Sequence, residues 1–230
     1  MRNSLCFCAA IFFSCVILAR ADLTIVQKVE GTGQDGDITV KIKGDKERID
    51  APSQPTRILD AKAGDMTDLI NDRKTFVKIT AAQIKAATDK ITSDGTNKSP
   101  SKLAPTGKKE TINGYETEEY VIQGKQFSAS FWVAAKYPDA ANILKQMEGP
   151  MSGAWKPSNM GMPDYSEFKG LPLKTIISVG PNQVVTTIQS IKQDPVSASE
   201  FEIPKDFQPL KEPIESASQP EAASSPSPRP

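Results

Sequence analysis

The sequence predicts an α+β fold that is mainly antiparallel β, in which a curved, unclosed half-barrel sheet carries helices over its concave face. The first observation is a series of turn signals between apolar runs, at Asn113-Gly114, Gly124-Lys125 and Gly180-Pro181-Asn182, which is typical of consecutive hairpins. The second is the lack of room for the crossover helices that a parallel sheet needs between most of its strands. The third is that the later strands are apolar on both faces, so both faces need a cover.

The first half of the domain has the pattern of five short strands. Ile38, Val40 and Ile42 alternate with polar residues, so one face of that strand is buried and the other is solvated. Gly44-Asp45 then turns the chain. The expected strands are Asp37–Lys43, Lys46–Asp50, Thr56–Asp60, Met66–Ile70 and Lys74–Ile79.

Two amphipathic helices interrupt the strands. Thr80 and Gln83 form a capping-box pattern ahead of a buried stripe that starts at Ile84. The second helix is expected to start with Pro138 as its first residue and to stop at Gly149-Pro150. Its buried stripe consists of Ile143, Leu144 and Met147. A polar loop is expected between the first helix and the next strand, over Ser93–Thr106.

The later strands differ from the early ones because apolar residues occupy both of their faces. In Phe127–Ala135, Phe131 lies on one face and Trp132 on the other, and Leu173–Val179 and Val184–Ile191 show the same two-sided pattern. Such a sheet must be covered on both sides, by helices or by an apolar ligand. Two short helices cover only part of it, so the sequence predicts an apolar groove between helices and sheet.

The two ends of the chain are expected to lie outside the folded domain. Residues 1–21 have the three parts of a secretory signal peptide: the charge of Arg2, the apolar run Leu5–Leu18 and the small-x-small site Ala19-Arg20-Ala21. The expected domain is 22–211, followed by a disordered Pro/Ser/Ala-rich tail at 212–230. Two alternatives remain for residues 1–21: an uncleaved membrane anchor, or a lipid attached to Cys15.

Cleavage would remove all the cysteines, so the mature domain would have no disulfide and no transmembrane anchor. The expected location is outside the cytoplasm, in the periplasm or, alternatively, beyond the cell. Oligomeric state is not indicated by the sequence.

Composition excludes several classes of function. The 28 basic and 28 acidic residues balance, whereas nucleic-acid binding needs clustered and uncompensated Lys and Arg. The chain has no histidine, and the mature part has no cysteine, so the commonest bases, nucleophiles and metal ligands are missing. We therefore expect no catalytic residue, no cofactor and no metal site. Two alternatives are a carboxylate pair at Glu116 and Glu118, and Cu(I) on Met160-Gly161-Met162.

The stretch from Met147 to Met162 is unusually rich in methionine and proline. Methionine repacks around irregular partners at low cost, so this stretch predicts a lid over the apolar groove. The alternative is that it closes one end of the core. The candidate groove and lid residues are Phe131, Trp132, Leu144, Met147, Met151, Trp155, Met160 and Met162.

Several segments in the same order resemble an exported bacterial domain family of unknown function (DUF4412-like). These segments are Gly44–Asp50, Thr111–Tyr120, Phe131–Ala134, Lys169–Leu173 and Phe201–Pro204. That family is similar in fold to the periplasmic lipoprotein carriers of the LolA type. The resemblance implies a half-barrel with helices over its concave side, and it implies no catalytic residues.

These observations favour an exported envelope protein that binds an apolar ligand, either a lipid or an acylated protein, as a carrier or sensor without catalysis. The first alternative is a protein–protein interaction module with a self-filled core, whose tail reaches an envelope partner. A carboxylate-based hydrolase is the remote alternative.

Overall fold

A computed structural model describes residues 22–31, 35–93, 102–124 and 127–210. The expected signal peptide (1–21) and tail (212–230) lie outside the described residues. In the described part, no helix is long and apolar enough to cross a membrane.

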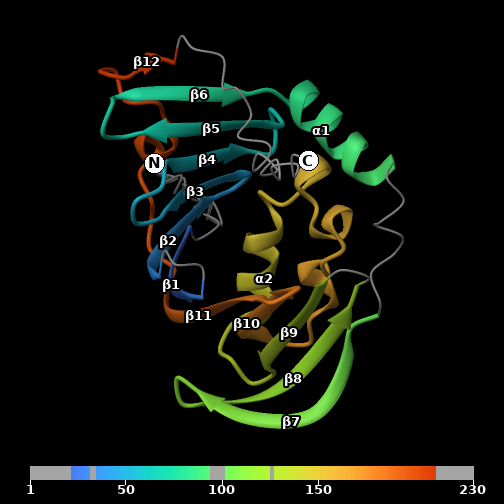
Figure 1. Cartoon of the computed structure of the whole chain (residues 1–230). Helices are drawn as coiled ribbons and strands as arrows, with labels where there is room; N and C mark the ends of the chain where they lie inside the picture. Colours follow the sequence, from blue (N-terminus) through green and yellow to red (C-terminus); the bar gives the residue numbers. More distant parts are fainter. Residues whose placement is uncertain (1–21, 32–34, 94–101, 125–126, 211–230) are drawn as a thin grey trace, which may run out of the picture.

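Twelve strands of the described chain form one open sheet, in the order β12-β6-β5-β4-β3-β2-β1-β11-β10-β9-β8-β7. All neighbours are antiparallel except β12 and β6, which are parallel. The sheet curls around α2, and its two edges do not meet (Figure 1). This confirms the curved, mainly antiparallel half-barrel. The strands are β1 (Leu23–Glu30), β2 (Gly36–Lys43), β3 (Lys46–Asp50), β4 (Thr56–Asp60), β5 (Asp65–Ile70), β6 (Thr75–Ile79), β7 (Ala104–Ile112), β8 (Tyr115–Gln123), β9 (Phe127–Ala134), β10 (Leu171–Val179), β11 (Asn182–Lys192) and β12 (Gln208–Pro209).

The five early strands, β2 to β6, lie within one residue of their expected bounds. The Asn113-Gly114 signal is also confirmed, since both residues have positive φ, 51° and 82°, as a two-residue hairpin turn requires. The sequence-based prediction did not include β1, which pairs with β2 on one side and β11 on the other. This strand joins the two halves of the sheet.

The first helix, α1 (Ala81–Ser93), begins as expected. The Thr80 backbone N–H donates to Gln83 Oε1 over 2.9 Å, and the Gln83 N–H donates to Thr80 Oγ1 over 3.4 Å. Ile84 packs on the inner face of the sheet against Leu59 and Met66. The segment that follows, residues 94–101, lies outside the described residues.

The second helix, α2 (Ala140–Glu148), buries Ile143 and Leu144 as expected. Its predicted start at Pro138 is wrong, because Asp139 is the N-cap and has a left-handed φ of 55°. A turn comes first, in which the Ala140 N–H donates to the Tyr137 carbonyl. This turn reverses the chain after β9 and sends α2 back over the sheet.

The far end of the sheet is strongly curled. Lys174 Nζ on β10 lies 3.1 Å from the Glu110 carboxylate on β7, although β9 and β8 separate these strands in the sheet and a flat sheet would place them about 14 Å apart. The β7–β8 hairpin therefore folds beneath β9 and β10 and covers one of their faces. Lys174 also lies 5.3 Å from the centre of the Trp132 ring, on that same face.

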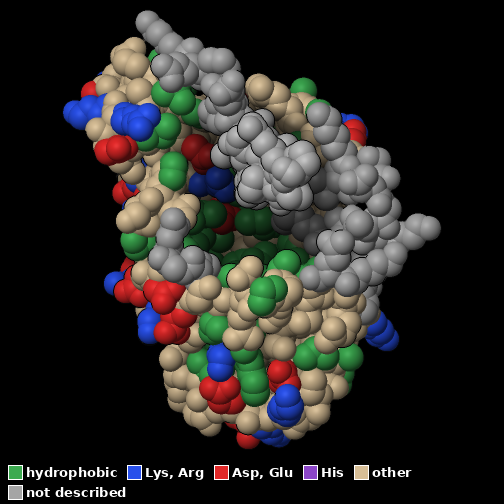
Figure 2. Space-filling model, in the orientation of Figure 1, with side chains coloured by type: hydrophobic (Ala, Val, Ile, Leu, Met, Phe, Trp, Pro, Cys, Tyr) green, Lys and Arg blue, Asp and Glu red, His purple; other side chains and the backbone are tan. Residues whose placement is uncertain are grey.

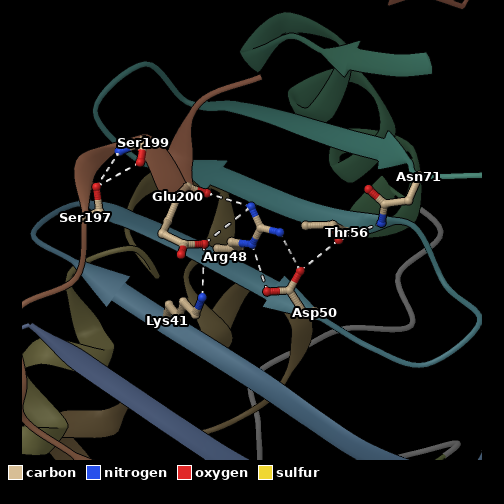
Figure 3. A network of polar contacts seen from close by, with 8 residues as sticks. All are labelled: Lys41, Arg48, Asp50, Thr56, Asn71, Ser197, Ser199 and Glu200. Atoms are coloured by element: carbon tan, nitrogen blue, oxygen red, sulfur yellow. Dashed lines mark hydrogen bonds and ion pairs between the residues drawn. The ribbon is translucent and has the colours of Figure 1, made fainter. Parts of the chain in front are cut away.

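Residues 193–210, here called the C-terminal strap, pack against the outer face of the early strands. Phe201 is buried in a cluster with Ile58 and Leu69. Arg48 donates to the Glu200 carbonyl over 2.9 Å and pairs with Asp50, in the polar network of Figure 3. The strap ends in β12 at the β6 edge. The strap therefore covers much of the outer face of the early strands, and the inner face faces α2 (Figure 1).

Candidate apolar ligand site

A cavity of about 300 Å³ lies between the inner face of the sheet and the segment that follows α2. Figure 2 shows the concave side of the molecule hollowed, with apolar side chains over much of the visible floor. Most of the lining is apolar, with hydroxyl and amide groups on the sheet side. The lining residues are Gln27, Phe131, Met147, Met151, Pro157, Met162, Pro163, Tyr165, Phe168, Pro172, Leu173, Thr175, Thr186 and Ile188.

The floor of the cavity is one continuous patch of the sheet. Phe131 on β9 is directly opposite Thr175 on β10, which in turn is opposite Thr186 on β11. Gln27 on β1 is opposite Ile188 on β11. Directly paired residues of antiparallel strands point to the same face, and Thr186 and Ile188 are two residues apart on β11, so these side chains lie on one face in two neighbouring rows.

The cover of the cavity consists of residues from α2, from the 3-10 helices η2 (Pro157–Met160) and η3 (Tyr165–Glu167), and from the segments that connect them. A further 3-10 helix, η1 (Gly153–Trp155), belongs to the same stretch of chain but does not line the cavity. Phe168 fixes the cover to the floor, because its ring meets the Phe131 ring edge-on at 5.1 Å between centroids. The cover has little regular secondary structure and is rich in methionine, so its packing can adapt to an occupant.

Asp164 holds the cover segment together. Its carboxylate accepts a hydrogen bond from the Ser158 N–H over 3.2 Å and pairs with Lys156 over 3.1 Å. Burial alone would raise the pKa of Asp164, but the Lys156 ammonium and the Ser158 hydrogen bonds outweigh it and lower that pKa. Asp164 also forms a capping box with Glu167 at the start of η3.

Four of the predicted groove residues come together around the cavity: Phe131, Met147, Met151 and Met162. Leu144 lies beside them in the main core, and Trp155 packs in a separate cluster with Leu59, Met66 and Ile84. Trp132 lies on the opposite face of β9, under Lys174. The side chain of Met160 is outside the described part of the structure.

The sequence-based prediction missed the polar part of the floor, namely Gln27, Thr175 and Thr186, and the aromatic residues Tyr165 and Phe168. A threonine within an apolar strand gives no signal of its own. The available signal was strand alternation, which places Thr186 on the same face as buried Ile188.

Charged groups also occur on the inner face of the sheet. Arg57 on β4 makes two hydrogen bonds to Asp68 on β5, of 2.8 and 3.0 Å. Glu47 on β3 is 4% exposed, and burial raises its pKa to about 7.

The acidic pair of the remote hydrolase alternative, Glu116 and Glu118, does not form an enclosed site. The Glu116 side chain is 72% exposed and pairs with Lys109. Glu118 accepts a hydrogen bond from the Tyr120 hydroxyl on the same strand, β8. The residues that the structure describes contain no cluster of three acidic, histidine or cysteine side chains that could hold a metal ion.

The chain belongs to the family described as a domain of unknown function, DUF4412, whose model matches residues 22–207. This confirms the resemblance found in the sequence. None of the curated proteins matches the chain.

Solved structures resemble the fold at low identity. PNGF-II matches with a TM-score of 0.42 and 15% identity over 83% of this chain, which spans only 31% of the PNGF-II chain. The Mycobacterium tuberculosis lipoprotein LppX matches with a TM-score of 0.40 and 10% identity, over 77% of this chain and 88% of its own. LprF from Mycobacterium bovis matches with a TM-score of 0.34 and 11% identity, over 82% of this chain and 90% of its own. These TM-scores are too low to carry a functional argument.

Proposed function

We propose that this protein is an exported, non-enzymatic carrier or sensor that binds one apolar chain, of a lipid or an acylated protein, in the cavity beneath α2. The observation that supports this best is the cavity itself: about 300 Å³ of space with a largely apolar lining. Small-molecule sites have this character and begin at about this size.

The cavity volume limits what can be bound. An apolar cavity of about 150 Å³ holds benzene, which has six carbon atoms, so 300 Å³ has room for on the order of 12 carbon atoms. That corresponds to a single chain of about dodecyl length. Each buried methylene would contribute about 0.8 kcal/mol to binding.

The cover fits a chain that must enter and leave. Methionine side chains from α2 and from the segment after it form much of the cover, and such unbranched side chains can repack around an occupant. In this account the protein acts outside the cytoplasm, most simply in the periplasm, where an apolar chain in transit needs protection from water.

Binding of 1-dodecanol, an uncharged single-chain probe, tests the proposal by calorimetric titration. We expect one site per chain. Thr186→Phe places a ring in the cavity and should weaken binding at least tenfold, since it displaces several methylenes. Gln189→Phe is the matched control, because Gln189 is exposed on the same strand. No binding by the wild-type protein, or equal binding by both variants, would contradict the proposal and favour the interaction module.

A further inference from the structure

Three acidic residues are buried in the described part of the chain: Asp22, Glu47 and Glu119. Asp22 accepts hydrogen bonds from Lys43 and from the Val196 N–H. Glu119 accepts a hydrogen bond of 2.8 Å from Thr106 and pairs with Lys108 at 3.3 Å. For Glu47, no hydrogen bond or ion pair to another described residue is found. A buried carboxyl without a partner calls for an explanation, because proteins normally pair such groups.

Glu47 points into the interior of the half-barrel. Its two cross-strand neighbours are Ile42 on β2 and Leu59 on β4, and both are 3% exposed on the inner face. The position is thus part of the apolar wall of the concavity, and the flanking Lys46 and Arg48 point outward to Asp60 and Asp50.

Glu47 lies near the cover of the cavity. The end of α2 packs on the β2–β3 turn that precedes Glu47, since a Cβ on Gly149 would lie 2.7 Å from the Gly44 carbonyl oxygen, and Met151, two residues after Gly149, lines the cavity. Tyr165 lines the cavity from η3, and burial, followed by the Glu47 carboxylate, raises the pKa of the Tyr165 hydroxyl. Arg57 is the basic group on the neighbouring strand, but it is opposite Ile49 rather than Glu47, and Asp68 already binds it at two points. Glu47 therefore lies beside the cavity with its acceptor oxygens available.

We propose that Glu47 binds the polar end of the ligand, and that this end is a protonated amine on a single apolar chain. This inference rests on the proposed function, because it adds a head group to the apolar chain of that proposal. An ammonium group offers three donors and the opposite charge, so it would satisfy a carboxylate that has no protein partner. A carboxylate head would add a second negative charge beside Glu47 and is disfavoured.

Two properties of the site favour an amine over an uncharged chain of the same length. The surrounding wall is apolar, which strengthens a charge-assisted hydrogen bond relative to water. In addition, burial raises the pKa of Glu47 to about 7. Amine binding should therefore strengthen as the pH rises through this value and the carboxyl ionises, whereas binding of an uncharged chain should not.

The test compares dodecylamine, 1-dodecanol and dodecanoate on the wild-type protein and on Glu47→Gln, each by calorimetric titration below the critical micelle concentration. At pH 8 the wild type should bind the amine roughly 10- to 100-fold more tightly than the alcohol. Glu47→Gln should remove that preference and leave alcohol binding within about twofold. Unchanged alcohol binding also shows that the variant is folded.

The pH series on the wild type is an independent measurement that needs no variant. Amine affinity should rise roughly tenfold or more between pH 5.5 and pH 8, with alcohol affinity constant. Equal binding of amine and alcohol, or an amine preference that survives in Glu47→Gln, would overturn the role of Glu47 and leave the apolar carrier proposal standing. Failure of all three dodecyl compounds to bind would overturn both.

Discussion

Glu47 makes the stability of the domain depend on pH, with a sign opposite to that of an ordinary paired carboxylate. Burial raises its pKa to about 7 in the folded protein, from an ordinary value of 4.5. A raised folded-state pKa means that the folded protein binds the proton more tightly than the unfolded chain. The stability that neutral Glu47 contributes is therefore fully present below about pH 4.5 and is lost as the pH rises through about 7.

The magnitude follows from the size of the shift. At about 1.4 kcal/mol per pKa unit, the contribution of Glu47 to the free energy of unfolding should be about 3 kcal/mol lower well above pH 7 than below pH 4.5. With a urea m-value of about 2 kcal/mol/M, the unfolding midpoint should fall by about 1.5 M. The chain has no histidine, so no imidazole titrates in this interval and obscures the effect.

Urea unfolding followed by circular dichroism between about pH 5 and pH 8 measures the effect. Glu47→Gln replaces the carboxyl with a neutral group of the same shape, so its midpoint should stay constant and exceed that of the wild type at pH 8. Glu119→Gln is the matched control, because Glu119 is also buried but is paired with Lys108 and should leave the slope unchanged. A wild-type midpoint independent of pH, or the same slope in Glu47→Gln, would show that Glu47 does not set the pH dependence of stability.

Two further predictions concern the frame around the site. Phe201→Ala should lower the free energy of unfolding by about 3–5 kcal/mol, because Phe201 is the buried anchor of the C-terminal strap against Ile58 and Leu69. A loss below about 1 kcal/mol in urea unfolding would mean that the strap is not part of the core. Gly149→Ala should lower the melting temperature, because a Cβ at this position would lie 2.7 Å from the Gly44 carbonyl oxygen. An unchanged melting temperature would contradict this packing of the end of α2 against the β2–β3 turn.

Local patterns were sufficient to predict much of the fold. Strict alternation around Ile38, Val40 and Ile42 predicts β2, and the Asn113-Gly114 pair predicts a hairpin that the positive φ angles confirm. These features are encoded by adjacent residues. The left-handed conformation of Asp139 before α2 is not encoded by adjacent residues, because it depends on the direction that the chain must take after β9. The curl that brings Lys174 to Glu110 likewise depends on residues 64 positions apart.

The candidate site was predictable only in part. Phe131 and the methionines stand out because large apolar residues cluster there, and four of the eight predicted residues line the cavity. Glu47 does not stand out, since it lies in a run of charged residues that has the appearance of a solvated strand. The signal was its spacing from Ile49, which puts both on one face of β3, but only the pairing with Ile42 and Leu59 shows that this face is buried.

The cavity beneath α2 should carry an apolar chain in the protein as its host makes it. Native mass spectrometry of the protein purified gently from the envelope of its own host, followed by organic extraction and lipid analysis, tests this most directly. We predict one single-chain passenger per protein, absent from Thr186→Phe and present in Gln189→Phe. A clean mass without a passenger, combined with no uptake of dodecyl compounds, would contradict the claim and leave the cavity as part of the protein core.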